Sequence, residues 1–521
     1  MKWYFAANLI SDYTDIFNKT DSTLTSRTGW SAASSISFAF NRLITGIIIA
    51  RIAGPEGVGK IAYLLWVADF ALMITSLGLN ASIIRFVAEM RGANNIQEAE
   101  QLSSWIFVRY FSLTLAGTVI LILVSFLIQT NRSDLLLWIL MSMLFFVQGL
   151  GTLYQAILAG NQRFDLLARL NFGYSILLVV GVVFGAWTWG IFGILGSYFI
   201  SACLPATLGI FMLKIKRMPP PLNKSLSKRI WKYSINTWIA AIVSSFVWSR
   251  MEIFFLNYYW NNYEVALFTI GITLSSTASQ GAMLLSGALV PHFAERLGAN
   301  DMEGIRKAYS SATKLIGVIV FPISLGGAAL IPLLVPLLYG SAFIGAIPVC
   351  MILMIFALLN FCSAGSALVY GLERSYFIAM SGLVGAIISF TINLILIPKM
   401  GSMGAVLVRS GTQVLMIVAG TYYIITRMRC PFPFASLAKN LLISFMCAAI
   451  IYIPVKCHLS WIILLLNLIS SAVIYLLLIR FFKVLTQKDL KPMEEIAYHF
   501  PTKLREKLMR FLAWFIKPLP A

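Results

Sequence analysis

Long apolar stretches separated by short polar segments run through nearly the whole chain. Each stretch holds about 20 consecutive apolar residues, enough for an α-helix to cross the hydrocarbon core of a bilayer. Membrane-spanning strands instead alternate apolar and polar positions over about 10 residues. The pattern therefore predicts an all-α integral membrane protein with about 14 transmembrane helices. We place these spans at 29–52, 59–79, 103–128, 134–158, 168–188, 190–215, 232–257, 263–288, 309–334, 342–371, 374–398, 401–427, 436–455 and 459–481.

A short segment of the chain occurs twice. Ala88–Asn94 reads AEMRGAN, and Ala294–Asn300 reads AERLGAN at an offset of 206 residues. Further along, Gly190 corresponds to Gly401 at an offset of 211, which indicates a short insertion. The first six spans fall on spans seven to twelve and keep their direction. We predict two parallel-duplicated six-helix lobes plus two additional C-terminal helices, an architecture found in many transporters.

The spans divide the chain into six segments. They are a cytoplasmic N-terminal segment (1–28), an N-lobe (29–215), a basic cytoplasmic linker (216–231), a C-lobe (232–427), spans thirteen and fourteen (428–481), and a basic amphipathic cytoplasmic tail (482–521). Between Thr502 and Ile516, apolar and basic positions fall on opposite faces of a helix. Such a helix would lie on an anionic leaflet rather than cross the membrane.

The distribution of charge predicts the orientation. The chain has 40 Lys and Arg against 20 Asp and Glu, a formal net charge of +20. Placing both termini and the even-numbered loops in the cytoplasm puts 31 of the 40 basic residues there, counting the flanking span ends. Because short loops rich in Lys and Arg stay on the cytoplasmic side, we predict cytoplasmic termini in the cell inner (cytoplasmic) membrane. The outer side receives Arg51, Lys60, Arg132, Lys399 and Lys456.

Composition excludes several classes of protein. With 59% hydrophobic and 12% charged residues, the chain is not a soluble globular protein. It has no soluble basic domain, so its positive charge does not predict nucleic-acid binding. The six cysteines lack C-x-x-C spacing and the three histidines are far apart, so we predict no metal site, cofactor or catalytic residue. No cleavable signal is evident.

Two segments carry a family resemblance. Arg51–Tyr63 reads RIAGPEGVGKIAY, and Leu338–Ala346 reads LYGSAFIGA. Together with the spans, they resemble the polysaccharide transporter (lipid-linked oligosaccharide flippase) family of the MOP exporter superfamily, over nearly the whole chain. In structural terms, Pro55 and its neighbouring glycines would form a tight outer turn. Pro322 and Pro332 would kink span nine, where neighbouring helices can satisfy the backbone.

The resemblance implies a fold and a function. Two six-helix lobes would rock between inward-open and outward-open states, and the extra helix pair would form a groove for a lipid tail. The implied substrate is a polyprenyl-diphosphate-linked oligosaccharide, such as an O-antigen, capsule or exopolysaccharide repeat unit. The implied partners are this substrate and membrane lipids, with glycan polymerase and chain-length proteins as further candidates.

Several charged residues fall inside the predicted spans. They are Arg42, Asp69, Arg109, Arg250, Glu252 and Arg409. Charges at membrane depth are costly and usually serve a function. The four arginines would make a lumen net positive, and guanidinium groups bind phosphate oxygens bidentately. We therefore predict that the arginines bind substrate, and that Asp69 or Glu252 couples transport to protons or sodium.

Each of these residues also has a structural alternative. Arg109 lies near the cytoplasmic end of its span and could extend to the interface. Arg250 and Glu252 lie near the outer end and could be interfacial. Arg42 and Asp69 lie equally deep on neighbouring spans and could form a structural ion pair.

Uncharged polar residues also occur at membrane depth. The candidates for polar lumen residues are Asn41, Gln280, Asn360 and Gln413. The alternative for each is helix–helix packing, which polar side chains commonly support in membrane bundles.

We compare three function classes with these features: a flippase, an exporter and a membrane enzyme. A flippase for a lipid-linked glycan agrees with a cationic lumen, and a lipid II type cell-wall precursor flippase is its nearest alternative. A cation-coupled multidrug or small-molecule exporter of the same superfamily is a second alternative, although a cationic lumen suits anionic cargo. A membrane enzyme is disfavoured, because every outer loop is short.

Overall fold

The computed structural model describes residues 24–129, 131–212, 222–248, 250–457 and 461–486, together with 489, 493, 494, 506 and 510. Most of the predicted N-terminal segment and of the tail, including nearly all of the amphipathic stretch from Thr502 to Ile516, lies outside the described residues, as does 213–221 in and beside the linker. Within the described ranges the chain is helical and contains no strand.

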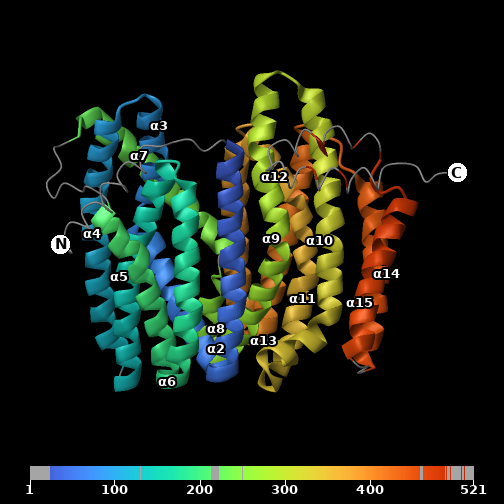
Figure 1. The fold of residues 1–521 in the computed structure, drawn as a ribbon, viewed down its shortest axis with the longest axis horizontal. Helices are drawn as coiled ribbons and strands as arrows, with labels where there is room; N and C mark the ends of the chain where they lie inside the picture. Colours follow the sequence, from blue (N-terminus) through green and yellow to red (C-terminus); the bar gives the residue numbers. More distant parts are fainter. Residues whose placement is uncertain are drawn as a thin grey trace, which may run out of the picture.

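The helices stand side by side in one bundle. Most of the N-terminal half lies on the left of Figure 1 and most of the C-terminal half on the right, although the helix Lys224–Trp248 of the C-terminal half lies on the left, beside Leu79–Gly92. The first half contains α2 (Leu24–Thr75), α3 (Leu79–Gly92), α4 (Ile96–Ile128), α5 (Arg132–Gly160) and α6 (Phe164–Met212). The second contains α7 (Lys224–Trp248), α8 (Glu252–Tyr259), α9 (Asn262–Gly298), α10 (Met302–Tyr339), η1 (Ser341–Ala346), α11 (Ile347–Ala357), η2 (Leu358–Cys362), α12 (Ser363–Gly371) and α13 (Ser375–Thr426). The last two helices are α14 (Phe434–Lys456) and α15 (Trp461–Phe481).

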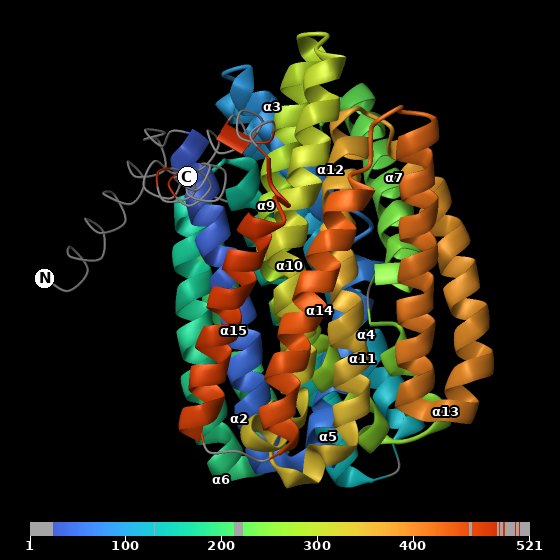
Figure 2. The ribbon, with the colours of Figure 1, turned by 90° about the vertical axis from the view of Figure 1, so that its right-hand side faces the viewer.

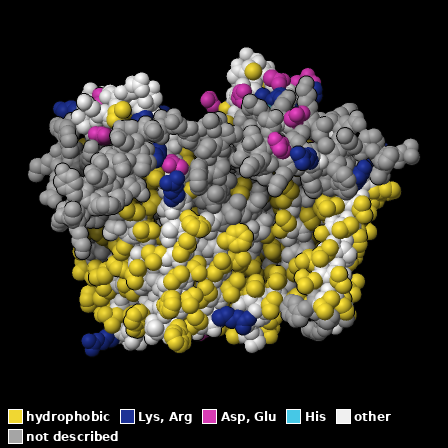
Figure 3. Space-filling view, viewed as in Figure 1, with side chains coloured by type: hydrophobic (Ala, Val, Ile, Leu, Met, Phe, Trp, Pro, Cys, Tyr) yellow, Lys and Arg dark blue, Asp and Glu magenta, His cyan; other side chains and the backbone are white. Residues whose placement is uncertain are grey.

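The apolar surface of this bundle suits a membrane. Among the described residues, nine helical stretches are long and apolar enough to span a bilayer. Figure 3 shows hydrophobic side chains over the middle and lower parts of the molecule, with most of the visible acidic and basic side chains above them. The prediction of an all-α membrane protein is therefore confirmed, whereas the number of about 14 spans stays a prediction.

Three of the long helices reverse direction at a glycine. Gly54 in α2, Gly190 in α6 and Gly401 in α13 have φ of 66°, 57° and 56°. Glycine adopts this left-handed region without the penalty that a Cβ brings. In α6, a Cβ built on Gly185 would lie 2.4 Å from the carbonyl oxygen of Gly193, so the two arms pack against each other. Each of these elements is thus a helical hairpin.

The backbone repeats in the two halves as the sequence predicts. Asn94 and Asn300, the last residues of the duplicated segment, both adopt left-handed φ of 58° and 56°. Gly190 and Gly401 also agree in ψ, at −130° and −134°. The parallel duplication is therefore confirmed at the level of backbone conformation, while the lobe limits of 29–215 and 232–427 stay predictions.

The final helix pair lies outside the duplication, on the C-terminal half. α14 packs against α10 and α15 packs against α14. The pair lies at the right-hand edge of the bundle in Figure 1 and faces the viewer in Figure 2. Leu325 and Ala329 of α10 form a buried apolar cluster with Ala448 and Ile451 of α14. Residues beyond α15 then return to α10, where Val484 and Leu485 are buried beside Leu315.

Asp489 fastens this returning segment to α10. Its carboxylate accepts hydrogen bonds from Ser311 at 2.8 Å and from the Lys314 ammonium at 2.9 Å, and Thr486 adds two more. Burial alone would raise the pKa of Asp489, but the hydrogen bonds from Lys314, Thr486 and Ser311 outweigh it and hold the pKa below its ordinary value. The ionised carboxylate is therefore stabilised in the folded protein.

Replacing Asp489 by Asn is expected to lower the free energy of unfolding by about 3 kcal/mol at neutral pH, since it removes one partner of a buried ion pair. Because the folded-state pKa is depressed, this contribution is present above the unfolded pKa and is lost as the pH falls through the folded pKa. Thermal unfolding of detergent-solubilised protein across acidic pH measures it. Glu303→Gln is the control, because the Glu303–Lys307 pair is exposed and should contribute little. Equal stability of both variants at neutral pH would contradict the assignment.

Candidate functional site

A cavity of about 590 Å³ lies between the two halves of the bundle. Its walls come from α2, α5, α6, α7 and α9 and from the segment at Arg250 and Ile253. The volume is within the range of about 300–1,000 Å³ that is typical of ligand pockets. The polar part of the lining includes Asn41, Arg42, Asp69, Gln148 and Arg250.

The hairpin of α2 supplies two of the cavity's charges. Arg42 lies before the reversal at Gly54 and Asp69 lies after it, so the two arms carry both side chains to the same cavity. Both side chains are accessible from it. The alternative of an Arg42–Asp69 ion pair is not realised, because these two described side chains form no salt bridge.

Arg250 reaches the cavity from an interruption in predicted span seven. α7 ends at Trp248 and α8 begins at Glu252, so the prediction of one continuous helix over 232–257 is wrong here. Discontinuous membrane helices commonly border binding sites, where irregular backbone can line a cavity. One terminal nitrogen of Arg250 is buried without a hydrogen-bond partner in the described part of the chain.

Glu252 and Arg409 lie together, outside the described lining of the cavity. An Arg409 Nη1–H group donates to Glu252 Oε1 at 3.4 Å, and the two side chains are 13% and 2% exposed. This pair joins α8 to α13. Among the predicted coupling acids, Glu252 is thus engaged with an arginine, whereas Asp69 borders the cavity.

Two further predicted residues, Arg109 and Asn360, also make contacts within the protein and lie outside the described lining of the cavity. Arg109 donates to the carbonyl oxygen of Trp105 at 3.1 Å and lies over the Trp105 ring at 3.5 Å, a cation–π contact outside the cavity lining. Asn360 donates to Ser279 at 2.9 Å, which joins η2 to α9.

Of the three remaining polar residues, one lines the cavity and two do not. Gln280 and Gln413 are half-buried and do not belong to the described lining. Asn41 does line the cavity, and its side-chain oxygen is buried without a partner among the described residues. The substrate-binding role of the four arginines, the coupling role of Asp69 or Glu252 and the lumen role of the four uncharged polar residues stay predictions.

Some lining residues were not singled out from the sequence. Gln148 on α5 donates from Nε2 to Asp69 Oδ1 at 2.8 Å. An amide in the middle of an apolar span is a signal that could have identified it. Trp66 and Phe70 also line the cavity and stack with ring centroids 5.2 Å apart. Aromatic residues are frequent throughout the spans, so these two carried no distinctive signal.

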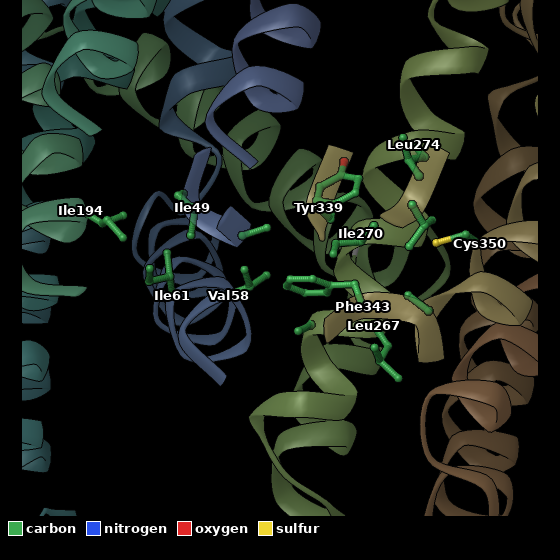
Figure 4. Close-up of a cluster of buried hydrophobic side chains, with 14 of the residues drawn as sticks. Ile49, Val58, Ile61, Ile194, Leu267, Ile270, Leu274, Tyr339, Phe343 and Cys350 are labelled. Atoms are coloured by element: carbon green, nitrogen blue, oxygen red, sulfur yellow. The ribbon is translucent and has the colours of Figure 1, made fainter. Parts of the chain in front are cut away.

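An apolar cluster between the halves closes one end of the cavity. Ile49, Val58 and Ile61 of α2 both line the cavity and belong to this cluster, which also includes Phe343 of η1 and Leu267 of α9. Figure 4 shows these side chains converging between the two halves. Each fully buried side chain of this size contributes about 1.5–3 kcal/mol of hydrophobic stabilisation, so the cluster helps to hold the two halves together here.

Arg51 fastens the same end with hydrogen bonds across the interface. Its Nε–H donates to the carbonyl oxygen of Leu338 at 2.8 Å, and a terminal N–H group donates to that of Leu337. α10 ends at Tyr339, and the last carbonyls of a helix lack partners within it and carry partial negative charge. The guanidinium therefore caps α10. The segments Arg51–Tyr63 and Leu338–Ala346, far apart in sequence, meet here.

Comparison with known proteins gives matches over most of the chain. The family model described as "Polysaccharide biosynthesis protein" matches residues 48–348. The succinoglycan biosynthesis transport protein ExoT of Rhizobium meliloti (strain 1021) is 24% identical over 346 residues, covering 63% of this chain. The match spans 65% of the length of that relative.

Solved structures share the fold at low identity. The inward closed conformation of the lipid II flippase MurJ superposes with a TM-score of 0.70 at 16% identity, covering 87% of this chain and 98% of that structure. The inward-facing conformation of a multidrug resistance MATE family transporter of the MOP superfamily gives 0.61 at 16% identity, covering 77% and 98%. These likenesses show that the bundle has the fold of MOP superfamily transporters.

Glu252→Gln is expected to lower the free energy of unfolding by about 3 kcal/mol, because Arg409 loses its carboxylate partner in a buried setting. The double variant Glu252→Gln/Arg409→Gln should recover part of this loss, since no unpaired charge remains. Thermal unfolding of the purified protein in detergent measures both. Additive losses in the double variant would show that the pair makes no coupled contribution.

Proposed function

This chain belongs to the polysaccharide biosynthesis protein family, and from that premise we propose that it is a flippase for a polyprenyl-diphosphate-linked oligosaccharide. The protein is a multi-pass membrane transporter of polysaccharide biosynthesis with a MurJ- and MATE-like fold, rather than an enzyme. The observation that carries the finer proposal is the cavity between its halves, where Arg42 and Arg250 outnumber the single acid Asp69.

The charge of the cavity favours an anionic head group. Arg42 and Arg250 form no salt bridge with a described carboxylate, so their guanidinium groups are available to a ligand. Guanidinium binds phosphate oxygens through paired, charge-assisted hydrogen bonds. A diphosphate therefore complements this cavity better than a cationic drug does.

The size and apolar lining of the cavity favour a head group with its first sugars. The volume of about 590 Å³ suits a ligand of drug-like size, so a long isoprenoid tail would stay in the surrounding lipid. The stacked rings of Trp66 and Phe70 offer flat apolar faces to sugar rings. Since the relative ExoT is described as a succinoglycan biosynthesis transport protein, an exopolysaccharide repeat unit is the preferred cargo.

Alternating access is the proposed mechanism. The apolar cluster and Arg51 hold the halves together at one end of the cavity, which the charge distribution assigns to the outer side. The head group would enter from the cytoplasm, bind Arg42 and Arg250, and leave outward after the halves rock and this end opens. The protein would act in the cytoplasmic membrane with both termini inside, beside glycan polymerase and chain-length proteins.

A lipid II type precursor is the second candidate cargo. The structure of the lipid II flippase MurJ is matched over 98% of its length with a TM-score of 0.70. A precursor of this kind would also use a cationic cavity. The family match and the ExoT relative favour the exopolysaccharide cargo over it.

Cells depleted of the protein are expected to accumulate lipid-linked oligosaccharide facing the cytoplasm, hidden from a membrane-impermeant lectin or glycosidase. Arg42→Ala should reduce transport by about 10–100-fold, the equivalent of about 1.5–3 kcal/mol for a hydrogen bond to a charged group. Arg132→Ala, at an exposed arginine that begins α5 outside the cavity, is the control. Normal sidedness in depleted cells would overturn the proposal. Accumulation of lipid II would favour the second candidate.

Arg51→Ala is expected to loosen the closed end of the cavity and to raise the accessibility of the cavity from outside the cell by about 3–10-fold, since it removes exposed hydrogen bonds from a charged donor. The measurement is the rate at which an impermeant maleimide labels Leu65→Cys, in a lining position, in a background free of native cysteines. Arg132→Ala should leave this rate unchanged. An unchanged rate in Arg51→Ala would show that the cap does not control opening.

A further inference from the structure

The only acid in the described lining of the cavity is held by a neutral amide. Gln148 Nε2 on α5 donates to Asp69 Oδ1 on α2 at 2.8 Å, and both side chains line the cavity. A glutamine amide offers donors without adding charge. The hydrogen bond thus anchors the carboxylate to the wall of the cavity and leaves its negative charge in place.

The two arginines of the cavity lie near this carboxylate without pairing with it. Arg42 and Arg250 both interact electrostatically with Asp69, yet none of these described side chains approaches another within 4.0 Å as a salt bridge. Arg42 and Arg250 repel each other, and repulsion is strong in a medium of low dielectric constant. A nearby carboxylate offsets part of that repulsion while the cavity is empty.

A carboxylate that paired directly with either arginine would have a different effect. Carboxylates and phosphates bind guanidinium with the same bidentate geometry, so Asp69 would then occupy the position that an anionic substrate needs. The distance that Gln148 maintains therefore matters for binding. It keeps the counter-charge of Asp69 in the cavity and keeps both guanidinium groups open.

We propose that Gln148 is a positioning residue that holds Asp69 away from Arg42 and Arg250, so that Asp69 serves as an internal counter-anion without blocking the anion site. This inference rests on the proposed function, because it takes the head group to be a diphosphate. According to this inference, Gln148 affects how tightly the anionic group binds and does not itself contact the sugars.

The proposal predicts a specific pattern in three variants. Gln148→Leu releases Asp69, which can then pair with the arginines and compete with the ligand. Asp69→Asn removes the competitor. In Gln148→Leu/Asp69→Asn there is no carboxylate left to position, so the loss of the amide should have no further effect. Such non-additivity marks two residues that act through one interaction.

The test is calorimetric titration of the purified full-length protein in detergent with inorganic diphosphate. We expect Gln148→Leu to weaken binding by about 10-fold, about 1.4 kcal/mol, and Asp69→Asn and the double variant to bind at least as tightly as the wild type. Gln155→Leu is the matched control, because Gln155 lies on the same helix outside the described lining. Size-exclusion profiles and thermal unfolding establish that each variant is folded.

Three outcomes would each contradict either the proposed function or the positioning role of Gln148, and the titrations distinguish them. Wild-type protein that binds no diphosphate would overturn the proposed function and this inference with it. Wild-type protein that binds, with Gln148→Leu binding equally well, would overturn the positioning role alone. A folded double variant as weak as Gln148→Leu would also overturn it, because the amide would then act on the ligand independently of Asp69.

Discussion

Hydrocarbon offers no hydrogen-bond partners, so every backbone N–H and C=O group at membrane depth must be satisfied within the protein. An α-helix does this along its own length, and helices make up most of the described ranges of the chain. The constraint also governs how the chain turns. Gly54, Gly190 and Gly401 reverse three long helices through left-handed backbone in single steps, with few residues outside helical conformation. The hairpin at Gly54 brings two charges to the cavity, because it sets Arg42 and Asp69 on adjacent arms.

Hydrocarbon also has a low dielectric constant, which makes an isolated charge costly. The buried charges of this protein meet that cost in two ways: some pair with each other, and others line the cavity. Glu252 and Arg409 are almost enclosed and pair with each other, as a stable bundle requires. Arg42, Arg250 and Asp69 line the cavity without a salt bridge among them. Unpaired charges at this depth are costly unless water or a ligand reaches them. The contrast between the two sets is what makes the cavity, rather than the ion pair, the candidate for binding.

The segments that carry the family resemblance lie at the closed end of the cavity. Arg51 belongs to one of them, and its acceptor Leu338 belongs to the other. Val58 and Phe343 bring the same two segments into one apolar cluster. The backbone also approaches closely here, because a Cβ built on Gly59 would lie 1.7 Å from the carbonyl oxygen of Asn262. These segments thus hold the two halves together at this end, whereas Arg42, Asp69 and Arg250 line the cavity deeper in the bundle.

The amino-acid sequence by itself determined the helical membrane fold, the parallel duplication and the candidate charges, because each depends on composition or spacing along one chain. Apolar length predicts a span whatever its neighbours are, and Asn94 and Asn300 repeat because their local sequences do. Only the tertiary structure decided which charges meet. Arg409 pairs with Glu252, Gln148 bonds to Asp69, and Arg250 reaches the cavity through a break in its helix. Such pairings depend on how each helix is rotated and where it is interrupted, and packing between distant segments sets both.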